Sequence, residues 1–194
     1  MSSIDEAFVD LTGLSKLYKM NYYELAKKIR ITIMEETGIP VSIGISRTKA
    51  LAKLASDKAK KQSSHICIAG KCGIQKLLKQ TSIEEIWGIG RRLTVNLKRL
   101  GILKTSELVA KQDEWLDKAI GINGIAMKHE LLGQMVSPVV NEEKIPKSIQ
   151  NTRAFGIFTA EFNYIKNELN KHVHTSCRKL RSYNTKCRQV GVML

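Results

Sequence analysis

The sequence predicts three segments of different fold class: an α/β layer, an all-α domain and an incomplete α+β domain. Three observations predict them. In residues 1–72 strand-like and helix-like patterns alternate, whereas over residues 73–140 only short helical patterns remain, separated by glycines. A polar stretch without periodicity, residues 141–150, then precedes a final strand, helix and strand within residues 151–194.

The α/β layer contains five predicted elements. Residues 2–11 mix apolar and acidic positions and end at a Thr-Gly pair, which predicts a strand or hairpin followed by a turn. Residues 23–36 carry apolar side chains at helical spacing, and the β-branched run 41–45 predicts a short strand. Residues 48–61 are rich in Ala, Leu and Lys and predict a helix, and residues 65–69 predict a last strand. Short connections between alternating elements favour the α/β class.

The C-terminal segment is predicted to be a β-α-β piece. Residues 152–158 and 188–194 have strand patterns, and residues 161–182 have a helical pattern between them. Two strands with uncovered edges do not make a stable sheet, so we expect an incomplete domain.

The net charge indicates a polyanionic partner. Lys and Arg number 32 against 18 Asp and Glu, which gives a net charge of +14 and a pI of about 9.7. The excess runs through all parts of the chain, as expected for a protein that lies along a nucleic acid backbone. Ribosomal association, or a generally basic proteome, would give the same charge.

Membrane and secreted classes are disfavoured by the sequence. No apolar run approaches the roughly 18 residues of a membrane helix, and the N-terminus lacks a basic region and an apolar signal core. We therefore expect a cytoplasmic, bacterial protein. The four cysteines contain no CxxC pair and complete no zinc-ligand spacing with the histidines, so they are predicted to be reduced thiols.

The adjacent carboxylates Asp5 and Glu6 are the sharpest local feature. They lie in an otherwise apolar segment, where desolvation is costly unless the carboxylates bind something positive. Mg²⁺ prefers such oxygen ligands, and two ions about 4 Å apart stabilise both oxygens of a phosphoryl transfer. On a straight strand the two side chains would point to opposite faces, so one shared site requires a bend. From spacing alone, an ordinary exposed turn remains the alternative.

Three lysines of the predicted helix 48–61 fall on one stripe. At 100° per residue Lys49, Lys53 and Lys60 lie within about 40° of one another, beside a face of small apolar residues. Such a row suits phosphate binding, and a solvated helix face explains it equally well.

A glycine pair near residue 90 predicts a phosphate-binding hairpin. Two glycines around one apolar residue permit a tight turn that presents backbone N–H groups beside the start of the next helix. A packing device for two helices is the alternative, and residues 121–124 repeat the pattern more faintly. The predicted DNA-binding residues are Gly88, Ile89, Gly90, Arg91 and Arg92.

Four stretches of the sequence resemble the Y-family of translesion DNA polymerases. SIDEAFVDLTG at residues 3–13 is similar to the signature of the palm domain, and GIPVSIGISRTKALAKLAS at residues 38–56 is similar to the strand and helix that follow it. IWGIGRRL at residues 86–93 resembles the thumb and is most similar to the sequence of the UmuC branch. RAFG at residues 153–156 resembles the first strand of the little finger. The resemblance covers nearly the whole chain.

The resemblance implies a domain order and an activity. It implies an error-prone DNA-directed DNA polymerase of DNA repair and the SOS response, with primer–template DNA and deoxynucleoside triphosphates as partners. A UmuD-like protein, RecA and a sliding clamp are further expected partners. The implied domains are a partial α/β palm over 1–72, a helix-hairpin-helix thumb over 73–140, a linker over 141–150 and a partial little finger over 151–194.

The resemblance also assigns roles to individual residues. Asp5 and Glu6 match catalytic carboxylates that bind two Mg²⁺ ions, and Lys60 matches a lysine that reaches the phosphates of the incoming nucleotide. Lys49 and Lys53 are further candidates for phosphate contacts. Asp10 lies outside that site and is interpreted as a turn carboxylate.

Parts of the family pattern have no counterpart in the sequence. The first catalytic aspartate, the steric gate and the fingers lie upstream of the SIDEA motif in the family, and the little-finger sheet continues beyond the last strand matched here. We therefore expect a truncated chain that is inactive by itself. Two alternatives are a non-catalytic, sequence-independent DNA-binding module and a regulatory protein that competes with an intact polymerase for its partners.

Overall fold

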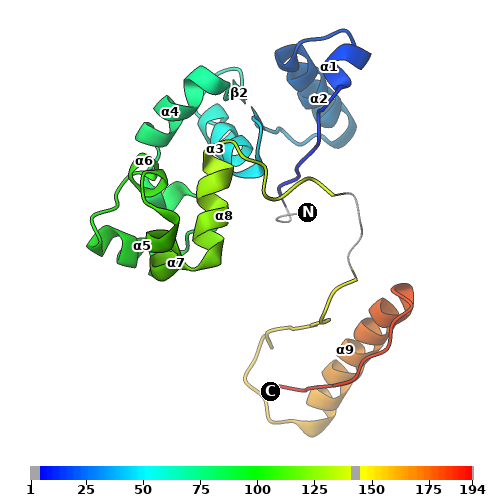
Figure 1. Cartoon of the computed structure of the whole chain (residues 1–194). Helices are drawn as coiled ribbons and strands as arrows, with labels where there is room; N and C mark the ends of the chain where they lie inside the picture. Colours follow the sequence, from blue (N-terminus) through cyan, green and yellow to red (C-terminus); the bar gives the residue numbers. More distant parts are fainter. Residues whose placement is uncertain (1–4, 141–144, 194) are drawn as a thin grey trace. The chain divides into compact units, whose positions relative to one another are not determined.

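The chain divides into two compact units, Met1–Val140 and Asn141–Leu194 (Figure 1). The computed structural model describes residues 5–140 and 145–193, in which helices predominate and strands are few. Within these two ranges, no helix combines the length and the apolar character that crossing a bilayer requires.

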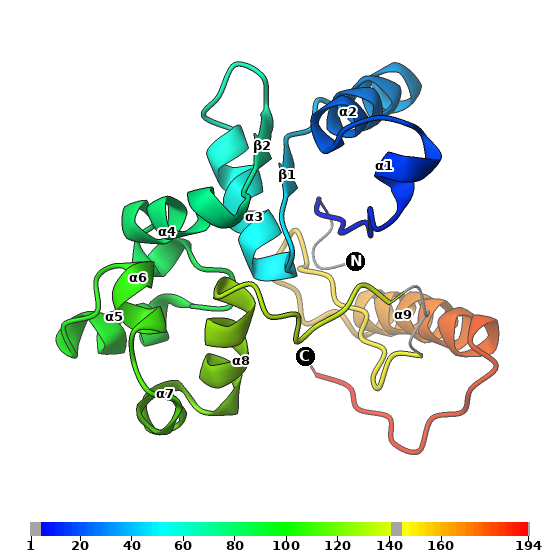
Figure 2. The ribbon, with the colours of Figure 1, turned by 45° about the horizontal axis from the view of Figure 1, so that its top comes forward.

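The strands of the first unit form a two-stranded parallel sheet. β1 (Ile43–Ile45) pairs with β2 (Ile66–Ile68) in the register Ile43 opposite Ile66, and helix α3 (Lys49–Ala59) connects them. Figure 2 shows the two strands side by side with α3 along them. This β-α-β arrangement confirms the strands predicted at 41–45 and 65–69, each somewhat shorter than expected.

Helix α3 lies directly against β1 because Gly44 has no side chain where the backbone of α3 passes. A Cβ built on Gly44 would come within 2.1 Å of the Ser56 backbone nitrogen and 2.2 Å of the Ala52 carbonyl oxygen. Ala55 and Ala59 are fully buried in the same contact layer. The buried alanine face fixes the rotation of α3 about its axis, and with it the side on which the lysine row lies.

Helix α2 (Tyr22–Thr37) confirms the helix predicted for residues 23–36. Asn21 and Glu24 form a capping box, in which the Asn21 side chain accepts two backbone N–H bonds and the Glu24 carboxylate accepts the Asn21 N–H. Gly38 ends the helix with a φ of 70°. Leu25 and Ala26 are buried, so α2 packs through this part of its surface.

The strand or hairpin predicted for residues 2–11 is corrected by the structure. Residues 2–4 lie outside the described range, Glu6 forms only an isolated bridge, and residues 7–11 have no regular structure. Asp10 accepts the Thr12 N–H at 2.9 Å, and this local turn ends the extended segment before a ladder forms. The helix α1 (Leu14–Leu17) follows directly and is too short to show a helical periodicity in the sequence.

The middle of the chain is helical, as predicted. A cluster of buried side chains from these helices, including Ile83, Leu97, Leu108 and Leu116, continues into the buried face of α3. The helical part and the β-α-β layer therefore share one hydrophobic core. The elements are α4 (Lys71–Gln80), the 3₁₀ turn η1 (Ile83–Glu85), α5 (Arg91–Arg99), α6 (Thr105–Val109), α7 (Asp113–Ile120) and α8 (Ile122–Leu131).

The second unit contains helix α9 (Phe162–Ser182), which confirms the helix predicted for residues 161–182. The Phe155 ring lies 5.6 Å from the Tyr164 ring, so the preceding segment packs on the helix. The strands predicted at 152–158 and 188–194 are not present in the described part of these segments, which ends at residue 193. A strand requires a hydrogen-bonded partner, and residues 152–158 and 188–193 do not pair with each other.

Candidate functional site

The carboxylate segment runs alongside helix α3. Asp5 lies in a turn and is exposed, so the chain does not continue as a straight strand through the two carboxylates. Glu6 is partly buried, and its Oε1 lies 2.6 Å from Nζ of Lys53 on α3. The structure therefore brings one predicted carboxylate into direct contact with the predicted lysine row.

The three lysines of the row make contacts at two separate places. Lys53 and Lys60 lie on one side of α3, and their Nζ atoms contact the same Asp57 Oδ1 at 3.0 Å and 2.8 Å. Lys49 instead donates to the carbonyl oxygen of Pro138 at 2.9 Å. Eleven residues at about 1.5 Å each separate Lys49 from Lys60 by roughly 16 Å along the helix. The three lysines therefore lie on one stripe of the helix, but Lys49 binds at a different place from Lys53 and Lys60.

Asp57 belongs to this cluster and was not among the residues predicted from the sequence. Its spacing from Lys53 and Lys60, four and three residues, is that of helical ion pairs and was the available signal. Burial alone would raise the pKa of Asp57, but hydrogen bonds from the two lysines and their charges outweigh burial and lower it.

Lys53 lies between two carboxylates. Burial favours a lower pKa for Lys53, but hydrogen bonds with Glu6 and Asp57, together with their negative charges, outweigh burial and raise it. Lys53 therefore remains an ammonium ion and neutralises part of the charge of the carboxylate segment.

The donor types at residues 5 and 6 fit Mg²⁺, which commonly takes one or two protein carboxylates and completes its shell with substrate phosphates and water. In the described ranges, no group of three or more His, Cys, Asp or Glu side chains is placed to hold a metal ion. Lys53, which contacts Glu6, would also compete with a metal ion for the Glu6 carboxylate. The described carboxylates therefore fit part of a magnesium site.

The glycine hairpin lies between η1 and α5. Ile86 and Ile89 are buried on either side of Gly88, whose φ of +95° favours glycine, and a Cβ on Gly88 would lie 3.1 Å from Cε of Met127. Gly90 caps α5 in an extended conformation with open space around its Cα. The two buried isoleucines anchor the turn, which leaves its glycines at the surface.

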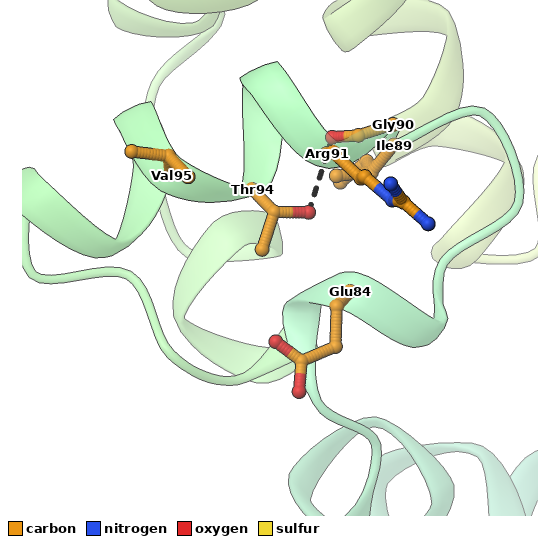
Figure 3. Close-up of a pocket in the computed structure, with 6 residues that line it drawn as sticks. All are labelled: Glu84, Ile89, Gly90, Arg91, Thr94 and Val95. Carbon is orange, nitrogen blue, oxygen red and sulfur yellow. Dashed lines mark hydrogen bonds between the residues drawn. The ribbon is translucent and has the colours of Figure 1, made fainter.

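The exposed side of the hairpin is basic and open. Arg91 and Arg92 begin α5 and are both exposed. Arg91 lines a surface pocket of about 520 Å³, together with Glu84 and Thr94 (Figure 3). The Thr94 hydroxyl donates to the Gly90 carbonyl at 3.1 Å, which stabilises the first turn of α5. Lys98 forms an ion pair with Glu84, so it is less available than the two arginines. The helix N-terminus and two free-standing guanidinium groups favour an anion at this surface.

The second glycine pair is built differently. Gly121, with a φ of 84°, joins α7 to α8. Gly124 is buried inside α8, where an added Cβ would lie 2.7 Å from Cβ of Ile120. Close helix packing therefore accounts for Gly124, and this turn lacks the open basic surface of the first hairpin.

The carboxylate segment and the hairpin are in contact. The rings of Phe8 and Trp87 have centroids 5.8 Å apart and planes inclined at 45°. One compact unit therefore holds the two carboxylates, the lysine row and the hairpin together.

Residues 1–57 match the family model described as the impB/mucB/samB family. The chain is 29% identical over 197 residues to Protein UmuC of Salmonella typhimurium, covering 99% of this chain and 46% of the relative. It is 32% identical over 203 residues to DNA polymerase IV 2 of Bacillus subtilis, covering 98% of this chain and 47% of the relative. The chain thus spans about half the length of these curated relatives.

Solved structures give the same result. The Y-family DNA polymerase chimera Dbh-Dpo4(243-245)-Dbh matches with a TM-score of 0.68 and 26% identity, over 92% of this chain and 51% of that one. DinB from Sulfolobus solfataricus matches with a TM-score of 0.58 and 31% identity, over 72% of this chain and 40% of that one. Sequence and fold together show that the chain belongs to the Y-family of DNA polymerases.

Proposed function

We propose that this chain contributes the SIDEA-motif part of the palm, the thumb and part of the little finger to an error-prone translesion DNA polymerase. The reaction is template-directed transfer of a nucleotide to a primer 3′ end. The observation that carries the proposal is the gathering of Asp5 and Glu6, the α3 lysines and the hairpin in one unit. Direct contacts of Glu6 with Lys53 and of Phe8 with Trp87 support it.

The carboxylates have the metal-binding role in this proposal. Asp5 and Glu6 would hold Mg²⁺ through their oxygens, and the bound ion would neutralise charge that develops on the transferred phosphoryl group. Lys53 and Asp57 keep Glu6 in place beside α3 through the chain of contacts from Glu6 to Lys53 to Asp57. When a metal ion binds Glu6, Asp57 would remain as a partner of Lys53.

The lysines divide between two roles. The Lys60 side chain is 57% exposed and extends from the end of α3, so its ammonium group is free to exchange Asp57 for a nucleotide phosphate. The Lys49 ammonium group is held by the Pro138 carbonyl oxygen and is better suited to holding the structure together. We therefore assign nucleotide-phosphate binding chiefly to Lys60.

The hairpin would grip the DNA backbone without selecting a sequence. Backbone N–H groups at the start of α5 and the guanidinium groups of Arg91 and Arg92 are suited to phosphate oxygens. The net charge of +14 extends the attraction over the surface of the chain. UmuD-like, RecA and sliding-clamp partners remain expectations from the family resemblance.

A non-catalytic DNA-binding module is the second candidate function. It is favoured by the absence of a three-residue metal cluster within the described ranges, while the hairpin is complete there. The two functions differ in whether the carboxylates matter.

A matched glycine pair tests the DNA-binding part. Gly90 and Gly70 both precede helices as extended caps, with φ of −82° and −80°, and both have open space around the Cα. Gly90→Val should weaken binding to all duplex sequences alike, because a side chain there keeps phosphate from the backbone N–H groups. Gly70→Val should cost similar stability and leave DNA affinity unchanged. Equal affinities of the two variants would contradict the hairpin assignment.

A chimera tests the catalytic part. The chain would be joined to the remaining half of a similar polymerase, and Asp5→Asn and Glu6→Gln would be compared with the parent in primer extension. Each change removes one negative charge with little change in size, so we expect a loss of about 10²-fold or more in rate with DNA affinity nearly unchanged. Lys60→Ala should mainly raise the KM for the nucleotide. Unchanged rates in both amide variants would leave the DNA-binding module as the better function.

A further inference from the structure

Two aromatic residues connect the carboxylate segment to the proposed DNA-binding hairpin. Phe8 lies two residues after Glu6, and Trp87 lies directly before Gly88. Their ring centroids are 5.8 Å apart across a long separation in sequence. The two segments thus meet through a pair of side chains that carry no charge.

The Phe8 ring is held from the α3 side. Nζ of Lys49 lies 5.8 Å from the centroid of the Phe8 ring and donates to the Pro138 carbonyl oxygen at 2.9 Å. One turn along α3, Lys53 holds Glu6. Lysines one turn apart on α3 therefore contact two positions of the carboxylate segment, and the Lys49 contact adds to the interactions of the Phe8 ring beside Trp87.

The Trp87 ring is held from the hairpin side. Its backbone lies between buried Ile86 and Gly88, whose left-handed conformation is backed by Met127 of α8. Trp87 itself is 44% exposed, which is high for a large ring that makes a specific contact. Packing of the core therefore does not account for the position of this ring, whereas the contact with Phe8 does.

We propose that Phe8 and Trp87 form a positioning pair that fixes the distance between the carboxylates and the hairpin. The pair holds DNA gripped at the start of α5 in a constant relation to Asp5 and Glu6. Conversely, the contact with Phe8 holds the hairpin in the conformation that binds phosphate. This inference rests on the proposed DNA binding by the hairpin.

A double-mutant cycle on DNA affinity tests the pair. Phe8→Leu, Trp87→Leu and the double variant would be titrated with labelled duplexes by fluorescence anisotropy. Each single change should weaken binding about two- to tenfold, the range that the loss of one aromatic contact allows. The double variant should bind no more weakly than Trp87→Leu, because Phe8 acts only through Trp87. The salt dependence should stay that of the parent, because no phosphate contact is lost.

The conservative variant Phe8→Tyr keeps the ring and should bind DNA with the affinity of the parent. In a Trp115→Phe background Trp87 is the only tryptophan, and Phe8→Leu should shift its emission while Phe8→Tyr should not. If Phe8→Leu fails to fold, Phe8→Met, which keeps apolar volume without a ring, takes its place in the cycle.

Two results would overturn the proposal: parent affinity in the folded Phe8→Leu or Phe8→Met variant, or single effects that multiply in the double variant. Failure of the proposed function looks different. In that case Gly90→Val would bind DNA as tightly as Gly70→Val, whatever residue stands at position 8.

Discussion

Replacement of Arg91 and Arg92 together by glutamine should reduce the salt dependence of DNA binding. Both side chains are exposed at the start of α5. Each lost phosphate contact lowers the slope of log affinity against log salt by about 0.9, so two contacts account for about 1.8. Between 50 and 200 mM salt, a fourfold change, the parent affinity should fall about 12-fold more than that of the variant.

The assay is fluorescence anisotropy with labelled duplexes of unrelated sequence at several salt concentrations. Lys76→Gln with Lys79→Gln is the matched control, because both lysines are exposed on α4. Each double variant lowers the net charge from +14 by 2, to +12. The control should lose some long-range attraction while its slope stays near that of the parent.

Equal slopes for the two double variants would refute the reasoning, because the effect would then follow net charge alone. Loss of binding to some duplex sequences and not others would also refute it, since backbone contacts carry no sequence information.

Three further predictions follow from the first unit and its site. Gly44→Ala should lower the free energy of unfolding in urea by about 3 kcal/mol, since its Cβ would meet the backbone of α3, whereas Gly73→Ala, with open space around it, should not destabilise. Asp57→Asn should be less stable than the parent at neutral pH. Because folding lowers the pKa of Asp57, its contribution is present above about pH 4 and lost as pH falls through the lowered value, so thermal melts of the two proteins should converge in acid. The 194-residue chain alone should add no nucleotide to a primer, and measurable single-nucleotide addition above a no-protein control would contradict this.

Elements with strong local patterns were predictable from the sequence. The apolar spacing of α2, the small-residue face of α3 and the glycines around the hairpin each follow from rules that act within a few residues. The lysine stripe was predictable for the same reason, because α3 is regular from Lys49 to Ala59. Helical geometry alone fixes these relations.

Elements that depend on distant partners were not predictable. The strand patterns at 152–158 and 188–194 give no ladder in their described residues, because pairing is decided by which segment lies alongside. The contacts of Glu6 with Lys53 and of Phe8 with Trp87 join residues far apart in the chain, and no local pattern indicates them. The partners of Lys49 and Lys60 differ for the same reason, although both lie on one stripe.

Glu130 explains why the two parts of the first unit hold a fixed relation. Its buried carboxylate accepts the Ala50 N–H at the start of α3 and the N–H groups of Val136 and Ser137 after α8. Its backbone carbonyl accepts the Thr48 hydroxyl at 2.7 Å. The hydrogen bonds of Thr48 and Ala50 are buried and satisfy groups at the start of α3 that would otherwise be unpaired, and those of Val136 and Ser137 are partly buried. The segment they hold ends at Pro138, whose carbonyl accepts Lys49, the lysine that contacts Phe8. A change at this buried carboxylate in α8 is therefore connected to the carboxylate segment through a continuous series of contacts, and such a connection would serve the proposed function, which requires DNA and metal to be held at a fixed separation.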